Sequence, residues 1–207
     1  MFHTPSDFSF IARFENDWEK IRDEYRGLDN KILDVHRNGS HEDYIQQIAE
    51  HNGWAPSWSV GSSERNVAWL TYGLCYRGVF PAEIAEKFPF TMALLRDTPA
   101  IFACAFSRML PGSRIAPHVH PELGGNLLTF HLGLEMAPRK SYLCINDASE
   151  EEAEGKSIVF DGAVEHSAFN ASDADRTILY VEFDKSIAMR QDRRMLTATP
   201  GDGTSIH

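Results

Sequence analysis

Four histidines in the second half of the chain are spaced as the residues of a metal site often are. His118 and His120 are two residues apart, His131 follows them, and His166 lies thirty-five residues after His131. Alternate residues of a β-strand point to the same face, so we expect His118 and His120 to point the same way. His166, on a neighbouring strand, would complete a facial set of ligands. Imidazole suits Fe, Zn, Cu or Ni, and the spacing therefore predicts a mononuclear metal site.

The residue at position 120 sets the type of centre. Two histidines and one carboxylate with open positions are typical of non-haem Fe(II) oxygenases. In the usual His-x-Asp/Glu arrangement the carboxylate would occupy position 120, where this chain has histidine. Either His120 supplies a third imidazole, or it points away and the metal keeps two protein ligands.

The composition is that of an ordinary globular chain. Its 207 residues are 43% hydrophobic and 24% charged, enough for one domain with a sizeable core. The formal charge of -10 argues against nucleic acid or an anionic membrane surface as the main partner. Cys75, Cys104 and Cys144 are widely spaced and odd in number, which favours free thiols in a reducing compartment.

The first half of the chain reads as mainly helical. Trp18, Ile21 and Tyr25 recur at helical spacing. We expect a strand or docking segment at 8–13, helices at 16–25 and 41–51, and a broken helix pair at 81–87 and 90–96. A strand is expected at 67–72. Residues 53–65 read as an ordered loop in which Trp54 and Trp58 pack against the protein.

Short β-rich segments follow Pro99 and are separated by turn residues. They are 101–109, 127–134, 142–145, 157–160, 164–169 and 177–183. Six short strands at close spacing predict a β-sandwich or barrel such as a jelly roll. A last helix is expected at 185–194. We therefore expect a single domain over 1–207, with a helical part at 1–97, a β core at 98–196 and a flexible tail at 197–207.

Several motifs of the chain resemble those of the aspartyl/asparaginyl β-hydroxylase family. They are Met-Leu-Pro-Gly-Ser (109–113), Pro-His (117–118), His-Leu-Gly-Leu (131–134), Glu-Gly-Lys-Ser-Ile-Val-Phe-Asp (154–161), Glu-His (165–166) and Arg176. The family consists of Fe(II)- and 2-oxoglutarate-dependent oxygenases. The resemblance implies a mainly β fold, a double-stranded β-helix of the jelly-roll or cupin type, with the N-terminal helices packed against it.

Site residues follow from the resemblance position by position. His118 and His166 are implied to bind Fe(II), and Arg176 to pair with the distal carboxylate of 2-oxoglutarate. A planar guanidinium suits that role because it binds a carboxylate bidentately and stays charged. Ser107 and His131 are implied to be further contacts of the co-substrate, and O₂ is the oxidant.

The chain departs from the family pattern at three places. His120 stands where the family often has glycine or an acid, and Thr129 stands where members tend to carry arginine. The turn at 121–125 contains a short insertion. These departures leave two alternatives to the 2-oxoglutarate oxygenase: a three-histidine cupin-type dioxygenase that uses O₂ without 2-oxoglutarate, and a non-catalytic metal-binding β-barrel.

The expected partner is a small-molecule substrate. No apolar run reaches the length of a membrane helix, and the N-terminus shows no signal segment, so we expect a cytoplasmic protein without membrane or nucleic-acid partners. The predicted reaction is hydroxylation, or another oxidation, of an unactivated C–H bond. An amino acid or amino-acid derivative is the expected substrate.

Overall fold

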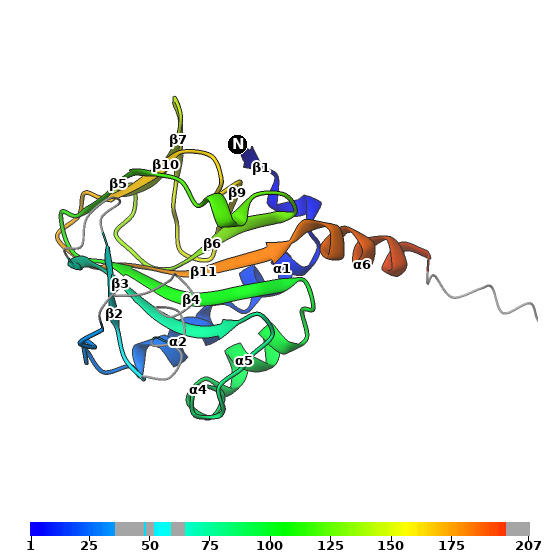
Figure 1. Ribbon diagram of the computed structural model, residues 1–207, viewed down its shortest axis with the longest axis horizontal. Coiled ribbons are helices and arrows are strands. Elements are labelled where there is room, and N and C mark those ends of the chain that lie inside the picture. The colour runs from blue at the N-terminus through cyan, green and yellow to red at the C-terminus, as the bar shows by residue number, and fades with distance from the viewer. Residues whose placement is uncertain (36–47, 49–51, 59–64, 198–207) are drawn as a thin grey trace, which may run out of the picture.

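The computed structural model describes residues 1–35, 48, 52–58 and 65–197, and the strands in that part of the chain form two antiparallel sheets (Figure 1). In spatial order, the larger sheet contains β1 (Phe2–His3), β9 (Ser157–Phe160), β6 (Leu127–Glu135), β11 (Arg176–Asp184), β4 (Ile101–Met109), β3 (Arg65–Tyr76) and β2 (Ala55–Trp58). The smaller sheet contains β5 (Arg114–His118), β10 (His166–Asn170), β7 (Ser141–Ile145) and β8 (Ala148–Glu151). This is the mainly β, jelly-roll architecture that the resemblance implied.

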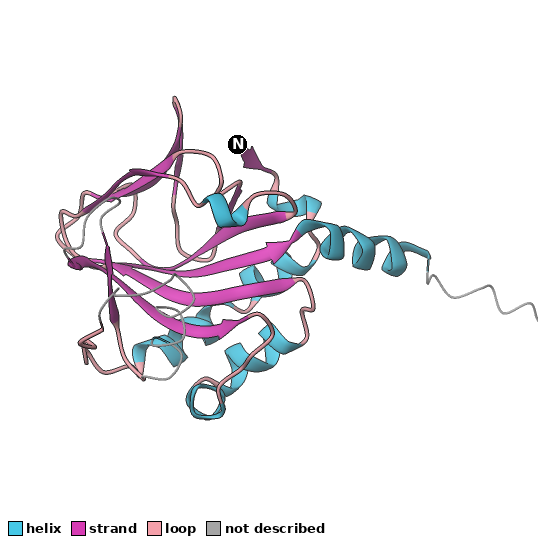
Figure 2. Cartoon of the chain, viewed as in Figure 1, coloured by secondary structure: helices cyan, strands magenta, loops and turns pink. Residues whose placement is uncertain are grey.

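The helices lie mostly on one side of the larger sheet, and the smaller sheet faces its other side (Figure 2). The helical elements are η1 (Pro5–Asp7), α1 (Phe10–Asn16), α2 (Trp18–Arg26), α4 (Ala82–Lys87), α5 (Pro89–Arg96), η2 (Pro121–Leu123) and α6 (Lys185–Thr197). Aromatic side chains fill the space between helices and sheet. For example, Phe14 of α1 packs edge-on against Phe130 of β6, with ring centroids 5.5 Å apart.

The two faces of the larger sheet differ in polarity because side chains alternate along each strand. On the helix side, Phe106 and Leu179 belong to the main core. On the opposite side, Ser107 of β4 and His131 and Tyr180 of β6 and β11 point between the two sheets, and Tyr180 is the register partner of His131. The space between the sheets therefore holds these polar groups beside a small apolar cluster that includes Met109 and Phe160. The predicted site residues gather in this space.

Most of the expected elements are present at the expected places. The helix at 16–25 is α2, and its C-terminal cap is Gly27. The broken pair is α4 and α5, with Pro89 in the first turn of α5. The six β-rich segments are β4, β6, β7, β9, β10 and β11, and the strand at 67–72 lies within β3. The helix at 185–194 is the first part of α6.

Two expectations for the N-terminal half are wrong. The strand considered at 8–13 is the start of helix α1, which buries Phe10, Ile11 and Phe14 on one side as a helix does. The segment expected to be a loop at 53–65 opens with strand β2, which pairs with β3. The helix expected at 41–51 lies outside the described residues except for Ile48, and the tail beyond residue 197 lies outside them as well.

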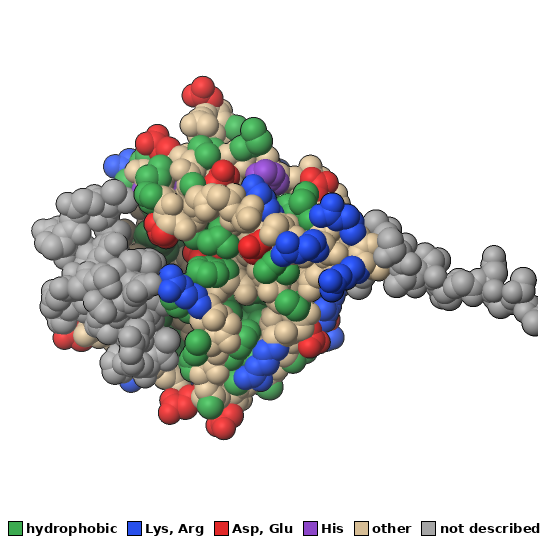
Figure 3. All heavy atoms as spheres, turned by 45° about the vertical axis from the view of Figure 1, so that its right-hand side comes forward, with side chains coloured by type: hydrophobic (Ala, Val, Ile, Leu, Met, Phe, Trp, Pro, Cys, Tyr) green, Lys and Arg blue, Asp and Glu red, His purple; other side chains and the backbone are tan. Residues whose placement is uncertain are grey.

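Strands from the first 97 residues belong to the same sheet as the later ones. β1 pairs with β9, and β3 pairs with β4 over most of its length. With β2, the helical part at 1–97 therefore supplies three strands to the larger sheet. At the other end of the chain, helix α6 extends from the end of β11, and Lys and Arg side chains gather beside it (Figure 3). Among the described residues, no helix is both long and apolar enough to cross a membrane.

Candidate metal centre

The three histidines considered as metal ligands, His118, His120 and His166, come together between the sheets. His118 ends β5, His166 begins β10, and the two are register partners across that strand pair. His120 follows two residues after β5. One ring nitrogen from each of the three lies within 4.8 Å of the others. The sequence interval between 118 and 166 is thus closed by an antiparallel pairing, as the metal-site prediction required.

Backbone carbonyls fix the orientation of two of the rings. His118 Nδ1 lies 2.9 Å from the Ala116 carbonyl oxygen, and His166 Nδ1 lies 2.8 Å from the Val164 carbonyl oxygen. A carbonyl oxygen only accepts, so each Nδ1 carries the hydrogen and donates it. In a neutral imidazole the other nitrogen, Nε2, then carries a lone pair. Metal-binding histidines are commonly held in this way, by a hydrogen bond from the nitrogen that does not bind the metal.

His120 is oriented by a carboxylate. Its Nδ1 lies 3.1 Å from Oε1 of Glu122, and its Nε2 lies 3.1 Å from Nε2 of His118. Two ligands about 2.1 Å from one ion lie roughly 3.0 to 3.4 Å apart when the angle between them is about 90 to 110°. The separation of these two nitrogens therefore fits two neighbouring ligands of one metal ion.

Burial favours the neutral form of two of the candidate ligands. His118 and His166 are 8% and 7% exposed. Burial lowers the pKa of His118 below its ordinary value, and it lowers the pKa of His166 to about 3 against the opposing effect of the bond to Val164. Metal binding requires a deprotonated imidazole, so these two rings need lose no proton at neutral pH to accept a cation.

The reason that His120 faces the centre differs from the predicted one. Strand β5 ends at His118, so alternation along a strand does not orient His120. Its backbone N–H donates to the carbonyl oxygen of Gly162 at 3.0 Å, and Pro121 then begins the short helix η2. The turn after the strand, together with Glu122, directs the ring toward His118.

The predicted co-substrate contact Ser107 lies beside the same centre. Trp69 of β3 donates its indole N–H to Ser107 Oγ at 3.1 Å, and its ring centroid is 5.9 Å from that of His118. Trp69 therefore lies against the three-histidine cluster. Trp54, by contrast, is fully buried in the main core on the helix side of the sheet. Of Trp58, only the backbone is described.

The predicted pair Arg176 and His131 is also brought together, but with a third residue between them. Glu152 Oε2 accepts from Arg176 Nε at 2.7 Å, and Oε1 accepts from Arg176 Nη2 and from His131 Nδ1, the latter at 2.9 Å. Arg176 is 1% exposed and Glu152 2% exposed. The guanidinium is thus held bidentately by a carboxylate of the chain itself.

This cluster is linked to the histidine centre by one aromatic ring. The Phe160 ring centroid is 4.9 Å from that of His131 and 5.1 Å from that of His166. Burial alone would raise the pKa of Glu152, but Arg176 and His131 more than offset it and lower the pKa to about 2. Glu152 is therefore a carboxylate, and the three-residue cluster is electrically neutral when His131 is neutral.

Glu152 was not predicted, because the sequence gives it no distinguishing mark within the acidic run 150–154. The one usable signal is indirect: a fully buried arginine such as Arg176 requires an acidic partner. Tyr180 and Glu182 were missed as well. Tyr180 donates to Glu182 Oε1 at 2.7 Å, and burial raises the pKa of Glu182 to about 7.

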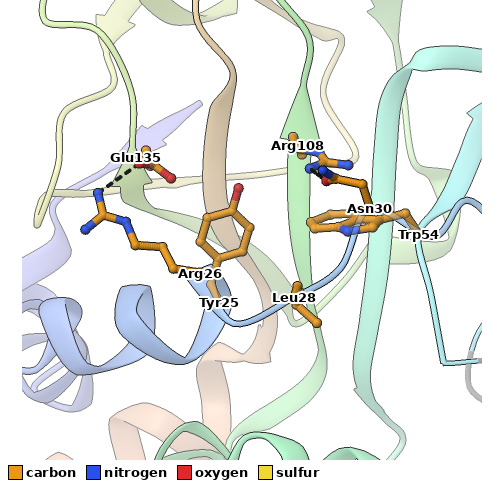
Figure 4. A pocket seen from close by; sticks show the side chains of 7 residues that line it. All are labelled: Tyr25, Arg26, Leu28, Asn30, Trp54, Arg108 and Glu135. Atoms are coloured by element: carbon orange, nitrogen blue, oxygen red, sulfur yellow. Dashed lines mark hydrogen bonds and ion pairs between the residues drawn. The ribbon is translucent and has the colours of Figure 1, made fainter.

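A separate pocket lies on the helix side of the larger sheet (Figure 4). Its lining residues are Tyr25, Arg26, Leu28, Asn30, Trp54, Arg108 and Glu135. Arg108 lies over the Trp54 ring and donates to Asn30 Oδ1 at 2.7 Å. Because Arg108 adjoins Ser107 in β4, the two side chains point to opposite faces, and this pocket is not part of the histidine centre.

Most of the chain is similar in sequence to a family of known hydroxylases. A family model described as Aspartyl/Asparaginyl beta-hydroxylase matches residues 15–186. The chain is 29% identical over 182 residues to the ornithine lipid ester-linked acyl 2-hydroxylase of Rhizobium tropici, and 26% identical over 201 residues to the aspartyl/asparaginyl beta-hydroxylase of Homo sapiens. These alignments cover 87% and 94% of the chain but only 59% and 24% of the two relatives.

Solved structures include a 2OG-Fe(II) oxygenase family oxidoreductase from Burkholderia pseudomallei. The similarity has a TM-score of 0.44 and 16% sequence identity, and it covers 76% of this chain and 96% of that one.

Proposed function

The chain belongs to the aspartyl/asparaginyl β-hydroxylase family, and we propose that it is an Fe(II)-dependent oxygenase that uses 2-oxoglutarate and O₂ to hydroxylate an unactivated C–H bond of a small molecule. The observation that carries this proposal is the convergence of His118, His120 and His166, two of them with Nδ1 tied to a backbone carbonyl. A hydroxylase family and a preorganised set of imidazoles point to the same chemistry.

The residues present fit an iron ion. Imidazole is a normal ligand of Fe(II), and three of them on one side leave coordination positions for small molecules. When bound, Fe(II) supplies the site at which O₂ is activated for oxidation of a C–H bond. The chain's own contribution is orientation and shielding. The hydrogen bonds of His118 and His166 hold the rings in place, and both residues are largely shielded from solvent.

The fit to 2-oxoglutarate is incomplete. Arg176 has the right chemistry for a distal carboxylate, and His131 and Ser107 lie nearby in the space between the sheets. However, Nε and Nη2 of Arg176 already donate to Glu152. Arg176 as placed offers a second carboxylate no uncompensated charge. The use of 2-oxoglutarate in this proposal therefore rests on the family.

The ion pair between Arg176 and Glu152 favours a second candidate function, a three-histidine oxygenase that works without a keto acid. The orientation of His120 toward His118 supplies the third imidazole, and Glu152 supplies the carboxylate that Arg176 would otherwise take from a co-substrate. Both candidates share the metal centre and differ in the source of electrons.

The proposed substrate is an amino acid or an amino-acid derivative. The support is local: Thr129, Tyr180 and Glu182 lie on the same face of the larger sheet as His131, and such polar groups can fix the orientation of a polar substrate. The Rhizobium tropici relative is named for a lipid and the Homo sapiens relative for aspartyl and asparaginyl groups. The proposed substrate, a small amino acid or derivative, therefore differs in class from the lipid.

Turnover assays distinguish these functions. The apoprotein is loaded with Fe(II) under air with a panel of amino acids and derivatives, and succinate release and O₂ consumption are measured with and without 2-oxoglutarate. We expect succinate release that is stimulated by at least one panel member and lost in His118→Ala. His3→Ala removes a histidine of the larger sheet outside the cluster and serves as the matched control.

Each negative result has a meaning. O₂ consumption that proceeds equally without 2-oxoglutarate would favour the keto-acid-independent candidate. An Fe(II)-loaded protein that consumes no O₂ and releases no succinate with any panel member would contradict the oxygenase proposal itself and support a non-catalytic metal-binding barrel.

A further inference from the structure

The buried carboxylate of Glu152 pairs with Arg176, the residue that the family resemblance implies would bind a co-substrate carboxylate. Its two oxygens accept from Nε and Nη2, which form one bidentate edge of the guanidinium, and one of the oxygens also accepts from His131. Both Arg176 and His131 are residues for which the family resemblance implies contact with 2-oxoglutarate. Arg176 and His131, the groups that should bind the co-substrate, thus already have a hydrogen-bond partner in the chain itself.

The backbone that carries Glu152 is fixed to both sheets. Its own N–H donates to the carbonyl oxygen of Ser141 in β7 at 2.9 Å, and the N–H of Gly155 donates to Gly133 in β6 at 2.9 Å. Gly133 allows this approach because a Cβ there would lie 2.0 Å from the Ala153 carbonyl oxygen. Glu152 is therefore held in place by the fold, and only rotation of its side chain would release Arg176.

Charge balance makes the site poor for a second carboxylate. Arg176 and Glu152 together are neutral, and both are shielded from solvent. A second buried carboxylate beside them would be an uncompensated negative charge, which is costly in a region of low dielectric constant. If the charge on Glu152 is removed, Arg176 becomes the uncompensated group and an incoming carboxylate neutralises it.

We propose that Glu152 is the specificity-determining residue of the co-substrate site, an internal competitor that weakens or prevents binding of the distal carboxylate of 2-oxoglutarate to Arg176. This inference rests on the proposed function only through the role given to Arg176. It predicts that the natural protein discriminates little between 2-oxoglutarate and a keto acid without a distal carboxylate, such as pyruvate. It further predicts that loss of the Glu152 charge restores the preference for 2-oxoglutarate.

The test is equilibrium binding to the Zn(II)-loaded protein, in which no turnover occurs. Affinities for 2-oxoglutarate and pyruvate are measured by calorimetry for the natural protein, Glu152→Gln and Glu152→Ala. The Gln variant keeps the shape of the side chain and an oxygen that accepts from Arg176, and it guards against misfolding of the Ala variant. Glu150→Gln is the matched control, since it removes one negative charge from the exposed strand β8, two residues away.

We expect Glu152→Gln to bind 2-oxoglutarate at least tenfold more tightly than the natural protein, with little change for pyruvate and with no change in Glu150→Gln. The gain should disappear in the double variant Glu152→Gln/Arg176→Met. The proposal is overturned if Glu152→Gln and Glu152→Ala bind 2-oxoglutarate no more tightly than the natural protein, or if 2-oxoglutarate and pyruvate gain equally.

Different results would contradict the role of Glu152 and the proposed use of 2-oxoglutarate. If the natural protein turns over 2-oxoglutarate and Glu152→Gln binds it no better, the inference is wrong and the function stands. If the natural protein ignores 2-oxoglutarate while Glu152→Gln binds it, the inference stands and the keto-acid-independent function is favoured.

Discussion

Replacing Glu152 with glutamine should make the stability of the protein depend less on pH in the acid range. The Glu152 carboxylate is buried between Arg176 and His131, and these partners lower its pKa from an ordinary value of 4.5 to about 2. The ionised form is therefore favoured in the folded state. Its contribution to stability is complete above about pH 4.5 and is lost as the pH falls toward 2.

The size of the effect follows from the pKa difference between unfolded and folded states. A difference of that size corresponds to about 3 kcal/mol of folding free energy at neutral pH, of which about 2 kcal/mol is lost by pH 3. Glu152→Gln resembles the protonated side chain, so we expect it to be about 3 kcal/mol less stable than the natural protein at pH 7 and about 1 kcal/mol less stable at pH 3. Such a loss still leaves a typical domain folded.

Urea unfolding of the metal-free protein, followed by tryptophan fluorescence at pH 7 and pH 3, measures both differences. Other carboxylates titrate in both proteins, so their contributions cancel in the comparison. Glu150→Gln, an exposed substitution of the same kind, should change the free energy of unfolding by less than about 0.5 kcal/mol at either pH. A difference between natural protein and Glu152→Gln that is small at pH 7, or equal at the two pH values, would refute the buried ion pair.

Three further predictions concern other parts of the same space. Burial raises the pKa of Glu182 to about 7, so its contribution to stability is present below about pH 4.5 and is lost as the pH rises through 7. Glu182→Gln should therefore be more stable than the natural protein by up to about 3 kcal/mol at pH 8, but not at pH 4, as measured by urea unfolding. Gly133→Ala should cost more than about 2 kcal/mol by the same assay, because of the Ala153 carbonyl oxygen, whereas Gly27→Ala, with its nearest neighbour at 3.4 Å, should cost less than about 0.5 kcal/mol. Zn(II) at 100 times its dissociation constant should stabilise the natural protein by about 2.7 kcal/mol. His166→Ala should abolish this stabilisation at the same Zn(II) concentration. If Zn(II) does not stabilise the natural protein, the three-histidine metal site is contradicted.

The parts of the fold that the sequence predicts are those with a buried face. β4, β6, β9 and β11 carry apolar side chains into the core, and this apolar pattern identified them as strands in the sequence. β8 is exposed along its whole length, and it has no apolar periodicity to find. In α1 the apolar residues Phe10, Ile11 and Phe14 lie close together in a short segment, where strand and helix periods are hard to tell apart.

The site shows the same division between local and long-range information. His118 and His166 were expected to meet because their motifs lie on short strands, and β5 and β10 pair with these two residues opposite each other. The orientation of His120 depends on a turn, a bond to Gly162 and the carboxylate of Glu122, which spacing alone does not reveal. The position of Glu152 depends on contacts of its backbone with two different sheets, which no local pattern encodes.

The central claim is that one metal ion is held by three imidazoles. A crystal structure of the Fe(II)-loaded protein, prepared without oxygen and with the ion located by its anomalous signal, tests this most directly. We predict one ion about 2.0 to 2.2 Å from Nε2 of His118, His120 and His166, close to the range of metal–imidazole distances. An ion bound by His118 and His166 alone, with the His120 ring turned toward solvent, would contradict the three-histidine centre.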